Sequence, residues 1–390
     1  MMIKSIKIML IPNNKQKTKL FQYSGASRFA YNWTLARQKE NYANGGKFIS
    51  DNDLRKEFTQ LKKTDEYAWL NDISNNVTKQ AIKDACDSYR RFFKGYSKFP
   101  KFKSKKKSKP SFYQDNVKIK FTNTHVKLEG FATSKKKNKQ KLNWIRLAEK
   151  DRFPFGEGVK YANPRITFDG LNWFVSVGIE CSDSINLPIN DGIGIDLGVK
   201  DLAICSDGIV YKNINKSKEV KKLEKKKRRL QRKVSKKYLL NKKGGSYRKT
   251  CNIIKSEKQL LKVSRRLTNI RQNYSHQVTT EIIKRNPSFI SVENLNVGGM
   301  MKNRCLSKAV QQQSFYEFKR KIQYKSKWNN IKFIEIDRWY PSSKTCSECG
   351  CVKSDLKLSD REFVCPSCGI VLDRDYNASI NIKNYGQSMI

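Results

Sequence analysis

Four cysteines in the last fifth of the chain have the residue type and spacing of a metal site. They form two Cys-x-x-Cys pairs, Cys346 with Cys349 and Cys365 with Cys368, separated by residues 350–364. Two such pairs can place four thiolates tetrahedrally around one Zn²⁺. We therefore predict one structural zinc site with these four ligands.

A second set of residues offers oxygen ligands. Asp196 and Glu293 each end a short apolar run typical of a buried strand, and Asp373 and Asp375 precede the expected last helix. Carboxylates at strand ends and at a helix start can converge at one edge of a sheet. Three hard oxygen ligands favour Mg²⁺ over zinc. Two such ions about 4 Å apart would activate water and stabilise the leaving oxygen in phosphodiester cleavage.

Each acidic motif has a plainer interpretation when taken alone. The sequence Gly194-Ile195-Asp196-Leu197-Gly198 also occurs in actin-like ATPases, where it faces ATP phosphates. A single aspartate at a helix start is often only an N-cap. The nuclease interpretation therefore depends on the combination of carboxylates, cysteines and charge.

The charge of the chain points to a polyanionic partner. Lys and Arg total 81 against 35 Asp and Glu, a formal net charge of +46 over 390 residues. Such self-repulsion disfavours a compact state unless a polyanion is present, and nucleic acid is the expected one. A ribosome-associated or membrane-surface protein is the alternative.

The ten cysteines are too sparse for a disulfide scaffold, so a reducing compartment fits.

No membrane partner is expected. The opening residues carry lysines inside their apolar run, which makes a poor signal peptide. No apolar run approaches the roughly 20 residues needed to span a bilayer. We expect a cytoplasmic, nucleoid-associated monomer.

The first half of the chain predicts a β-rich module interrupted by helices. Residues 3–11 read as a strand, residues 15–95 as mostly helical, and residues 99–107 as a basic loop with interspersed aromatics. The strand at 3–11 is expected to join the later strands. The loop 134–141, with three consecutive lysines, is either a solvated hairpin tip or a phosphate contact. The later strands are predicted at 117–121, 125–129, 142–147, 164–168 and 172–180.

The second half predicts a separate domain after a linker at 181–191. Residues 192–212 read as two strands around the turn Ser206-Asp207-Gly208. Residues 216–249 hold 17 Lys or Arg against 2 Glu, and with the next apolar stripe they predict a hairpin of two long basic helices. The remaining elements are expected as strands at 288–292 and 332–336, and helices at 307–329 and 377–384.

Several motifs together resemble one known family. The matching segments are Gly194 to Ala203, Val292 to Met300, Pro341-Ser342-Ser343-Lys344-Thr345-Cys346, Asp373-Arg374-Asp375-Tyr376-Asn377-Ala378, and Phe99-Pro100-Lys101-Phe102-Lys103-Ser104-Lys105. They are similar to those of the TnpB family, transposon-encoded RNA-guided DNA endonucleases that are kin to type V CRISPR effectors. The motifs cover the second half densely and the first half loosely.

The resemblance implies a multidomain α+β fold. It implies an oligonucleotide-binding β-barrel (the wedge) with an inserted helical recognition domain, followed by a split RuvC-like nuclease of RNase H fold with an inserted zinc ribbon. The expected boundaries are 1–13 and 96–190 for the wedge, 14–95 for the recognition domain, 191–340 and 371–390 for the nuclease, and 341–370 for the zinc ribbon.

The resemblance also implies an activity and its residues. Family members bind a structured guide RNA, check a short motif beside the target on double-stranded DNA, and cut the DNA. Asp196, Glu293 and Asp375 are the implied catalytic Mg²⁺ ligands, with Asp373 as a neighbour and Asn377 as a support. Nucleic-acid contacts are expected at Gln80, Lys101, Lys103, Lys105, Lys106, Arg228 and Arg229.

Other functions remain open at this point. Some relatives have lost acidic residues and act as RNA-guided repressors, but all three carboxylates are present here. A transposase that joins strands itself would use the same fold and metals. An actin-like ATPase is a more distant alternative.

Overall fold

The structure is a computed structural model that describes residues 2–132, 141–156, 158–181, 189–357 and 359–390. Its internal contacts divide the chain into two compact units, Met1–Ser182 and Asp183–Ile390. The division falls within the predicted linker at 181–191, most of which lies outside the described residues, as does nearly all of the loop 134–141. Each unit is described separately below.

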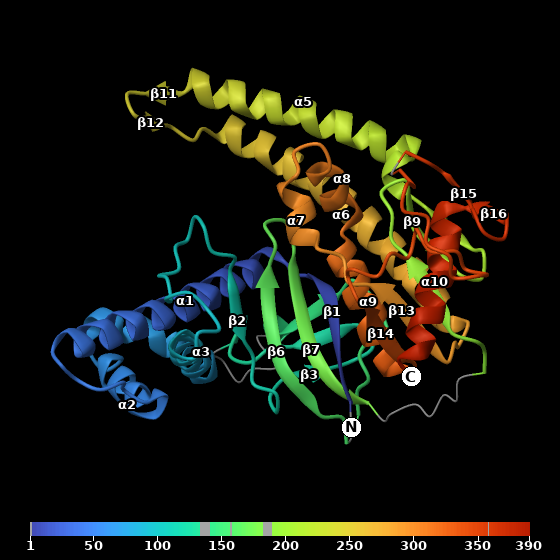
Figure 1. The fold of residues 1–390 in the computed structure, drawn as a ribbon. Coiled ribbons are helices and arrows are strands. Elements are labelled where there is room, and N and C mark those ends of the chain that lie inside the picture. The colour runs from blue at the N-terminus through green and yellow to red at the C-terminus, as the bar shows by residue number, and fades with distance from the viewer. Residues whose placement is uncertain (1, 133–140, 157, 182–188, 358) are drawn as a thin grey trace. The chain divides into compact units, whose positions relative to one another are not determined.

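The first unit is built on a seven-stranded sheet in the order β2-β6-β7-β1-β5-β4-β3 (Figure 1). Its central strand β1 (Met2–Ile11) pairs antiparallel with β7 (Trp173–Cys181) along nearly its whole length and with β5 (Trp144–Leu147) at its end. The predicted strand at 3–11 thus joins the later strands, as expected. The other strands are β2 (Ser111–Tyr113), β3 (Lys120–Phe121), β4 (His125–Lys127) and β6 (Tyr161–Phe168).

One strand prediction in this unit needs correction, and one strand was not predicted. The strand predicted at 117–121 is reduced to β3, because Asp115 accepts hydrogen bonds from the amides of Val117 and Lys118 and closes a turn there. The sequence analysis also missed β2. Its three residues are too few to show an alternating pattern, and only pairing with β6 identifies them as a strand.

The helical part of the first unit lies between β1 and β2. It consists of α1 (Asn14–Ala43), α2 (Asp51–Leu61), the 3₁₀ segment η1 (Asp65–Asp72) and α3 (Asn75–Phe93). Asn13 and Gln16 form a capping box that begins α1. Apolar residues of all these helices share one core with the sheet. A 3₁₀ turn, η2 (Lys141–Asn143), precedes β5.

The second unit contains a five-stranded sheet in the order β10-β9-β8-β13-β14. Residues 192–212 form three strands rather than the two predicted, because residues 197–200 turn the chain between β8 and β9. The turn at Ser206-Asp207-Gly208 does join two strands, with Gly208 at φ 83°. The strands are β8 (Ile193–Asp196), β9 (Asp201–Cys205), β10 (Val210–Lys212), β13 (Phe289–Glu293) and β14 (Lys332–Ile336).

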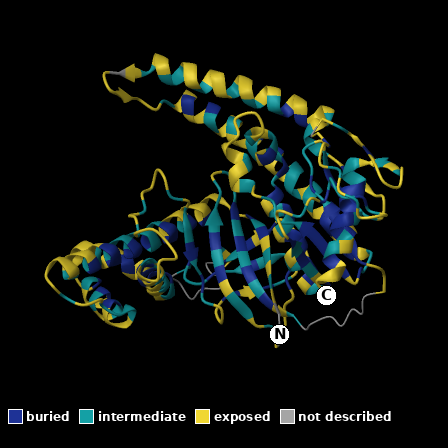
Figure 2. Cartoon of the chain, in the orientation of Figure 1, coloured by how far each residue is buried: buried dark blue, intermediate teal, exposed yellow. Residues whose placement is uncertain are grey.

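Helices cover both faces of this sheet. Ile193 and Ile195 of β8, with Ile290 and Val292 of β13, share a core with residues of α6 (Cys251–Lys284) and α9 (Phe315–Trp328). The alternate residues on the opposite face meet α10 (Arg374–Ser388), where Ser291 Oγ donates to the carbonyl of Ile382 at 2.9 Å. Figure 2 shows the central strands of this sheet as buried.

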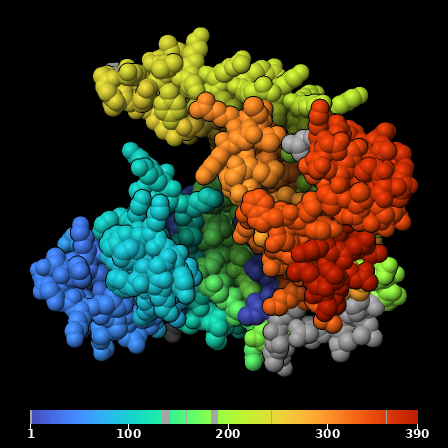
Figure 3. Space-filling view, viewed as in Figure 1, coloured from blue at the N-terminus to red at the C-terminus, as the bar shows by residue number. Residues whose placement is uncertain are grey.

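The predicted basic hairpin is present. It consists of α5 (Lys218–Leu240) and α6, joined by the small strands β11 (Lys242–Lys243) and β12 (Ser246–Tyr247). A short core containing Val220, Leu223, Val263 and Leu267 holds the two helices together. Figure 3 shows α5, in yellow-green, with its side chains at the surface, and only Val220 and Leu223 of this helix are buried. A short 3₁₀ segment, η3 (Ile214–Lys216), leads into α5.

Two helix predictions in the second unit need correction. The helix predicted at 307–329 is divided into α8 (Ser307–Gln313) and α9, because Ser314 adopts a left-handed conformation at φ 56°. A further short helix, α7 (Val297–Lys302), precedes them. The last helix begins at Arg374, not at Asn377 as predicted, so Asp375 lies in its first turn. The cysteine ribbon (residues 341–370) precedes it. Two small strands, β15 (Glu362–Val364) and β16 (Val371–Asp373), flank the second cysteine pair.

Candidate active site and metal centre

Two of the predicted carboxylates end neighbouring parallel strands. Asp196 is the last residue of β8 and Glu293 is the last residue of β13. Ile195 is in register with Val292, so Asp196 and Glu293 both stand one position further along. Side chains at matching positions of parallel strands point to the same face of the sheet. The register therefore aims both carboxylates to the α10 side.

The third carboxylate comes from the helix that covers this face. A side chain at Gly194 would lie 2.1 Å from the carbonyl oxygen of Ser379, and one at Gly386 would lie 2.5 Å from Cβ of Ser291. The absence of a side chain at these two glycines lets α10 lie directly on β8 and β13. Its first turn, with Asp375, then reaches the strand ends that carry Asp196 and Glu293.

Asp373, the other aspartate of this motif, caps the helix. Its carboxylate accepts hydrogen bonds from the amides of Asp375 at 3.0 Å and Tyr376 at 3.1 Å, which makes it the N-cap of α10. Such a cap satisfies amides that have no partner within the helix. The cap fixes the point at which the helix begins, and therefore the position of Asp375.

The electrostatics of the site reflect the convergence of like charges. Burial raises the pKa of the Asp196 carboxyl well above its usual range, and the nearby carboxylates of Glu293 and Asp375 raise it further. Burial also raises the pKa of Glu293, against the opposing effect of a hydrogen bond from Ser342. The two neighbouring carboxylates therefore disfavour ionisation of Asp196, and a bound cation would relieve that repulsion.

Ser342 connects the carboxylate site to the cysteine ribbon. Its hydroxyl donates to Glu293, and its carbonyl accepts from the side-chain amide of Asn381 on α10 at 2.8 Å. Asn377, one turn earlier, donates to the carbonyl of Thr345 at 2.7 Å and accepts from the amide of Ser347 at 3.0 Å. Asn377 and Asn381 are fully buried or nearly so. The two asparagines thus hold the first cysteine pair against the helix that carries Asp375.

Two arginines that the sequence analysis did not assign face Asp375. Arg374 donates through Nε at 3.0 Å and through Nη2 at 2.7 Å, both to Oδ1, and Nη1 of Arg361 lies 3.7 Å from Oδ2. The sequence Asp373-Arg374-Asp375 signals a charge pair, but only the fold shows which aspartate the arginine contacts. In this arrangement Arg374 compensates part of the negative charge.

A small cavity opens beside Glu293. It has a volume of about 220 Å³, and Lys319 and Arg338 contribute cationic groups to its wall. Lys319 also pairs with Glu335 at 2.9 Å, and Nε of Arg338 donates to the carbonyl of Asn294 at 3.3 Å. Neither residue was assigned a role from the sequence, since Lys319 lies in a predicted helix and Arg338 follows a predicted strand. Two cationic groups on the wall of one cavity could bind an anionic ligand there.

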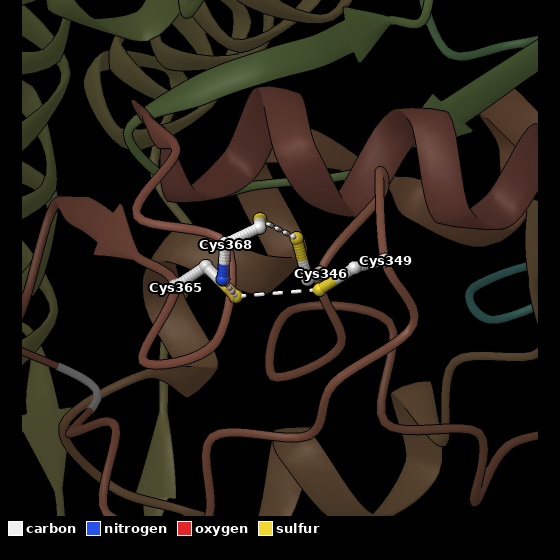
Figure 4. A group of neighbouring side chains, drawn as sticks. All are labelled: Cys346, Cys349, Cys365 and Cys368. Carbon is white, nitrogen blue, oxygen red and sulfur yellow. Dashed lines mark hydrogen bonds between the residues drawn. The ribbon is translucent and has the colours of Figure 1, made fainter.

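The four cysteines of the ribbon form a compact cluster (Figure 4). Their sulfur atoms all lie within 4.8 Å of one another, with Cys346 and Cys368 separated by 3.7 Å and Cys349 and Cys365 by 3.5 Å. Four sulfurs at about 2.3 Å from one tetrahedral ion would lie about 3.8 Å apart. The cluster is therefore compatible with a structural metal ion. The amides of Cys368 and Ser367 donate to Cys365 Sγ and lower the pKa of that thiol, which favours the ligating thiolate.

The carboxylates are spread more widely than the cysteines. In the described parts of the chain, only the four cysteines have ligand atoms that all lie this close. The donors themselves fit Mg²⁺, because all three are hard oxygen ligands on one face of the sheet.

The residues predicted to contact nucleic acid differ from one another in their exposure and in their contacts. Lys101, Lys105, Lys106, Arg228 and Arg229 are exposed. Lys103 is partly buried, with its ammonium 3.5 Å from the ring centre of Tyr31, and this burial lowers its pKa. Gln80 on α3 donates to Asp84 at 2.9 Å. These contacts stay predictions.

Three family models match the chain. A "Probable transposase" model matches residues 180–304, a "Cas12f1-like, TNB domain" model matches residues 315–382, and a "Helix-turn-helix domain" model matches residues 1–47. The last region consists here of β1 and the single 30-residue helix α1, which is not a helix-turn-helix. Together the matches cover more than half of the chain.

Two relatives match nearly the whole length of the chain, and a third matches about a third of it. "Putative RNA-guided DNA endonuclease" of Streptomyces pristinaespiralis is 29% identical over 98% of this chain and 89% of its own. "Putative RNA-guided DNA endonuclease InsQ" of Escherichia coli K12 is 27% identical over 100% of this chain and 93% of its own. "TnpB-like protein L79" of Acanthamoeba polyphaga mimivirus is 31% identical over 34% of this chain and 26% of its own.

One solved structure shares the fold. It is a cryo-EM structure of a Cas12f1-sgRNA-target DNA complex, with a TM-score of 0.62, 14% identity, and coverage of 98% of this chain and 99% of that chain. At this identity the similarity shows a common fold. Family models, full-length relatives and fold agree, and the chain belongs to the TnpB family.

Proposed function

We propose that this protein is an RNA-guided DNA endonuclease. It binds a guide RNA, recognises a short motif beside the target on double-stranded DNA, and cleaves the DNA at a Mg²⁺-dependent RuvC-like site. The observation that carries the proposal is the convergence of Asp196, Glu293 and Asp375 on one face of a mixed sheet. The names of the two relatives that match nearly the whole chain agree with it.

The proposed domains follow the described elements. The seven-stranded sheet serves as the wedge β-barrel, and α1 to α3 serve as the recognition domain. The five-stranded sheet with α10 is the nuclease, and the cysteine ribbon binds one Zn²⁺. Base pairing with the guide would carry the sequence information, while the basic surface holds the nucleic-acid backbone.

The chain's own residues suit phosphodiester cleavage. Bound Mg²⁺ would activate a water molecule and stabilise the leaving oxygen. Asp196, Glu293 and Asp375 would hold the ions, and Ser342 orients the Glu293 carboxylate. Lys319 and Arg338, on the wall of the adjacent cavity, would bind the phosphate being cut.

Substitution of one carboxylate tests the proposal. Asp196→Asn should lower guided DNA cleavage on the order of a thousandfold or more, since several kcal/mol of transition-state stabilisation depend on the metal. Binding of guide RNA and target should persist. Asp191→Asn is the matched control, because Asp191 is exposed and pairs with Lys383 outside the site. Undiminished cleavage by Asp196→Asn would refute the assignment.

The family description "Probable transposase" motivates a second candidate function. A transposase would join DNA strands with the same carboxylates and without any RNA. Incubating the purified protein with transposon-end DNA and Mg²⁺ separates the two activities. Strand-transfer products in the absence of RNA would favour the second function over the first.

A further inference from the structure

A cluster of aromatic rings lies at one end of the helical part of the first unit. Neighbouring ring centres of the cluster are 5.2 to 6.2 Å apart. Only Tyr89 is buried, whereas Phe93 is 65% exposed and Phe99 is 52% exposed. Packed aromatic rings that remain this accessible indicate a binding surface rather than a core. The rings belong to Phe48, Tyr89, Phe92, Phe93 and Phe99.

These rings line a cavity of about 520 Å³. Its walls come from the last turns of α1 and α3, from the segment 46–48, and from Phe99. Cavities that bind small organic groups measure roughly 300 to 1,000 Å³ and have mostly apolar walls. The size and the aromatic walls suit a flat aromatic ligand group.

The cavity is held open by hydrogen bonds. Gln38 exchanges two bonds with the backbone of Ile49, at 2.6 and 3.1 Å, and Asn41 donates to the carbonyl of Lys47 at 2.6 Å. A side chain at Gly46 would lie 2.4 Å from Oδ1 of Asn41, so glycine at this position lets Asn41 keep its bond to the loop. These contacts fix Phe48 before any ligand binds.

The rim of the cavity is cationic. Lys39 and Lys47 contribute to its lining, and both are exposed. In the described parts of the chain neither forms an ion pair, nor do the exposed lysines that follow α3, Lys94 and Lys98. The nearby carboxylates Asp51 and Asp87 are instead paired with Arg90, at 3.1 and 2.7 Å. The cationic charge around the rings is thus left for an external anion.

We propose that this aromatic cavity binds an unpaired base of a single nucleic-acid strand, while the rim lysines bind the flanking phosphates. Aromatic rings stack on any base, and lysines beside them track the backbone. A second copy of the chain is a poor occupant, because two lysine rims on chains of net charge +46 would repel each other. An apolar protein segment would leave the lysines without anions. The inference rests on the nucleic-acid binding in the proposed function and is independent of cleavage.

The test uses the full chain and three short single strands of equal length: oligouridylate, oligothymidylate and a strand without bases. Phe93→Ala and Phe99→Ala should each weaken binding to the base-containing strands about tenfold. Binding to the abasic strand should stay unchanged, because it depends on phosphates alone. Comparison of the two base-containing strands shows whether RNA or DNA occupies the cavity. Phe155→Ala is the matched control, since Phe155 is similarly exposed but lies outside both the cavity and the basic loop 99–107.

Photocrosslinking of the unaltered protein gives a second measurement that does not depend on variant folding. A strand containing 5-bromouracil should crosslink to the peptide with Phe93 and Phe99, as identified by mass spectrometry. Crosslinks confined to other regions, or an equal loss of abasic-strand binding in Phe93→Ala, would overturn the inference. A change from dimer to monomer in Phe93→Ala would instead identify a contact between copies.

The two proposals can fail separately. Loss of base-dependent binding in Phe93→Ala supports the cavity even if the protein never cleaves DNA. Conversely, guided cleavage that requires Asp196 supports the nuclease even if Phe93→Ala binds all strands normally.

Discussion

Ser342 is the residue through which the cysteine ribbon reaches the carboxylate site. Its hydroxyl bonds Glu293, while Asn381 holds its carbonyl at 2.8 Å. Removing the hydroxyl therefore leaves the backbone in place and frees only the carboxylate. Residues that orient metal ligands in this way affect metal affinity without touching the metal.

We predict that Ser342→Ala raises the Mg²⁺ concentration needed for half-maximal cleavage by about 10- to 100-fold. Binding of Mn²⁺, followed by electron paramagnetic resonance without any substrate, should weaken in parallel. Ser342→Thr should restore both, because threonine keeps the hydroxyl. The zinc content of the variant should equal that of the unaltered protein.

Ser343→Ala is the appropriate control for this prediction. Among the described residues, the side chain of Ser343 makes no hydrogen bond, so its removal should change neither measurement. If Ser342→Ala and Ser343→Ala behave alike, Ser342 does not position Glu293.

At the scale of elements, the packing of α10 on β8 decides whether the third carboxylate reaches the site. The contact is between backbones, since a Cβ at Gly194 would lie 2.1 Å from one α10 carbonyl and 2.4 Å from the amide of Lys383. Backbone atoms cannot move aside as a flexible side chain can. The contact therefore has little tolerance.

We predict that Gly194→Ala destabilises the second unit by about 3 kcal/mol. The displaced helix should also carry Asp375 away from Asp196 and lower cleavage. Calorimetric unfolding measures the first effect and a cleavage assay the second. Gly245→Ala, where nothing lies within 4 Å of the added carbon, should leave the Tm nearly unchanged. Equal Tm values for both variants would contradict the close packing.

The interface between α6 and α9 contains two buried lysines. Nζ of Lys321 donates to Oε1 of Gln272 at 2.7 Å, and Nζ of Lys325 donates to Thr279 and Thr280, both at 2.7 Å. Burial lowers the pKa of both lysines to about 8. Burial, together with these lysines, also lowers the pKa of His276 to about 4.

The lysines predict how stability depends on pH. Between pH 8 and the unfolded pKa of about 10.5, the unfolded chain binds more protons than the folded chain, so stability gains with rising pH. Lys321→Met should remove part of this gain. Between pH 7 and pH 9.5, the free energy of unfolding of the unaltered protein should therefore rise relative to that of the variant. Lys327→Met, at an exposed position of α9, should produce no such shift.

At the scale of the whole molecule, the net charge of +46 dominates. Unscreened repulsion should destabilise the protein alone, and salt should relieve it. We predict that the Tm of the free protein rises between low and moderate NaCl concentrations. Bound RNA should raise the Tm further, and its affinity should fall steeply as salt increases. Scanning fluorimetry with and without RNA measures both trends, and a Tm indifferent to salt would contradict the argument.

Many elements could be predicted because their signals are local. The strand at 3–11, the basic hairpin and the strands at 288–292 and 332–336 each show their period or their apolar run within a few residues. The break at Ser314 was not predictable, because its left-handed backbone has no distinguishing residue type. The early start of α10 was missed, since a cap aspartate resembles a ligand aspartate in sequence.

The candidate donor atoms could be read from the sequence: four thiols at metal spacing, four carboxylates in three motifs, and a cationic charge that favours a polyanionic partner. Residue type and short spacing suffice for these conclusions, because they depend on chemistry and on local chain geometry. Tertiary structure alone decided that Ser342 bonds Glu293, that Arg374 bonds Asp375, and that two lysines of α9 are buried. Most of those contacts join positions that are distant in sequence. The contact of Arg374 is local, but the sequence does not show which of its two neighbouring aspartates it bonds. Sheet register and helix packing fix them, and neither is encoded in a local pattern.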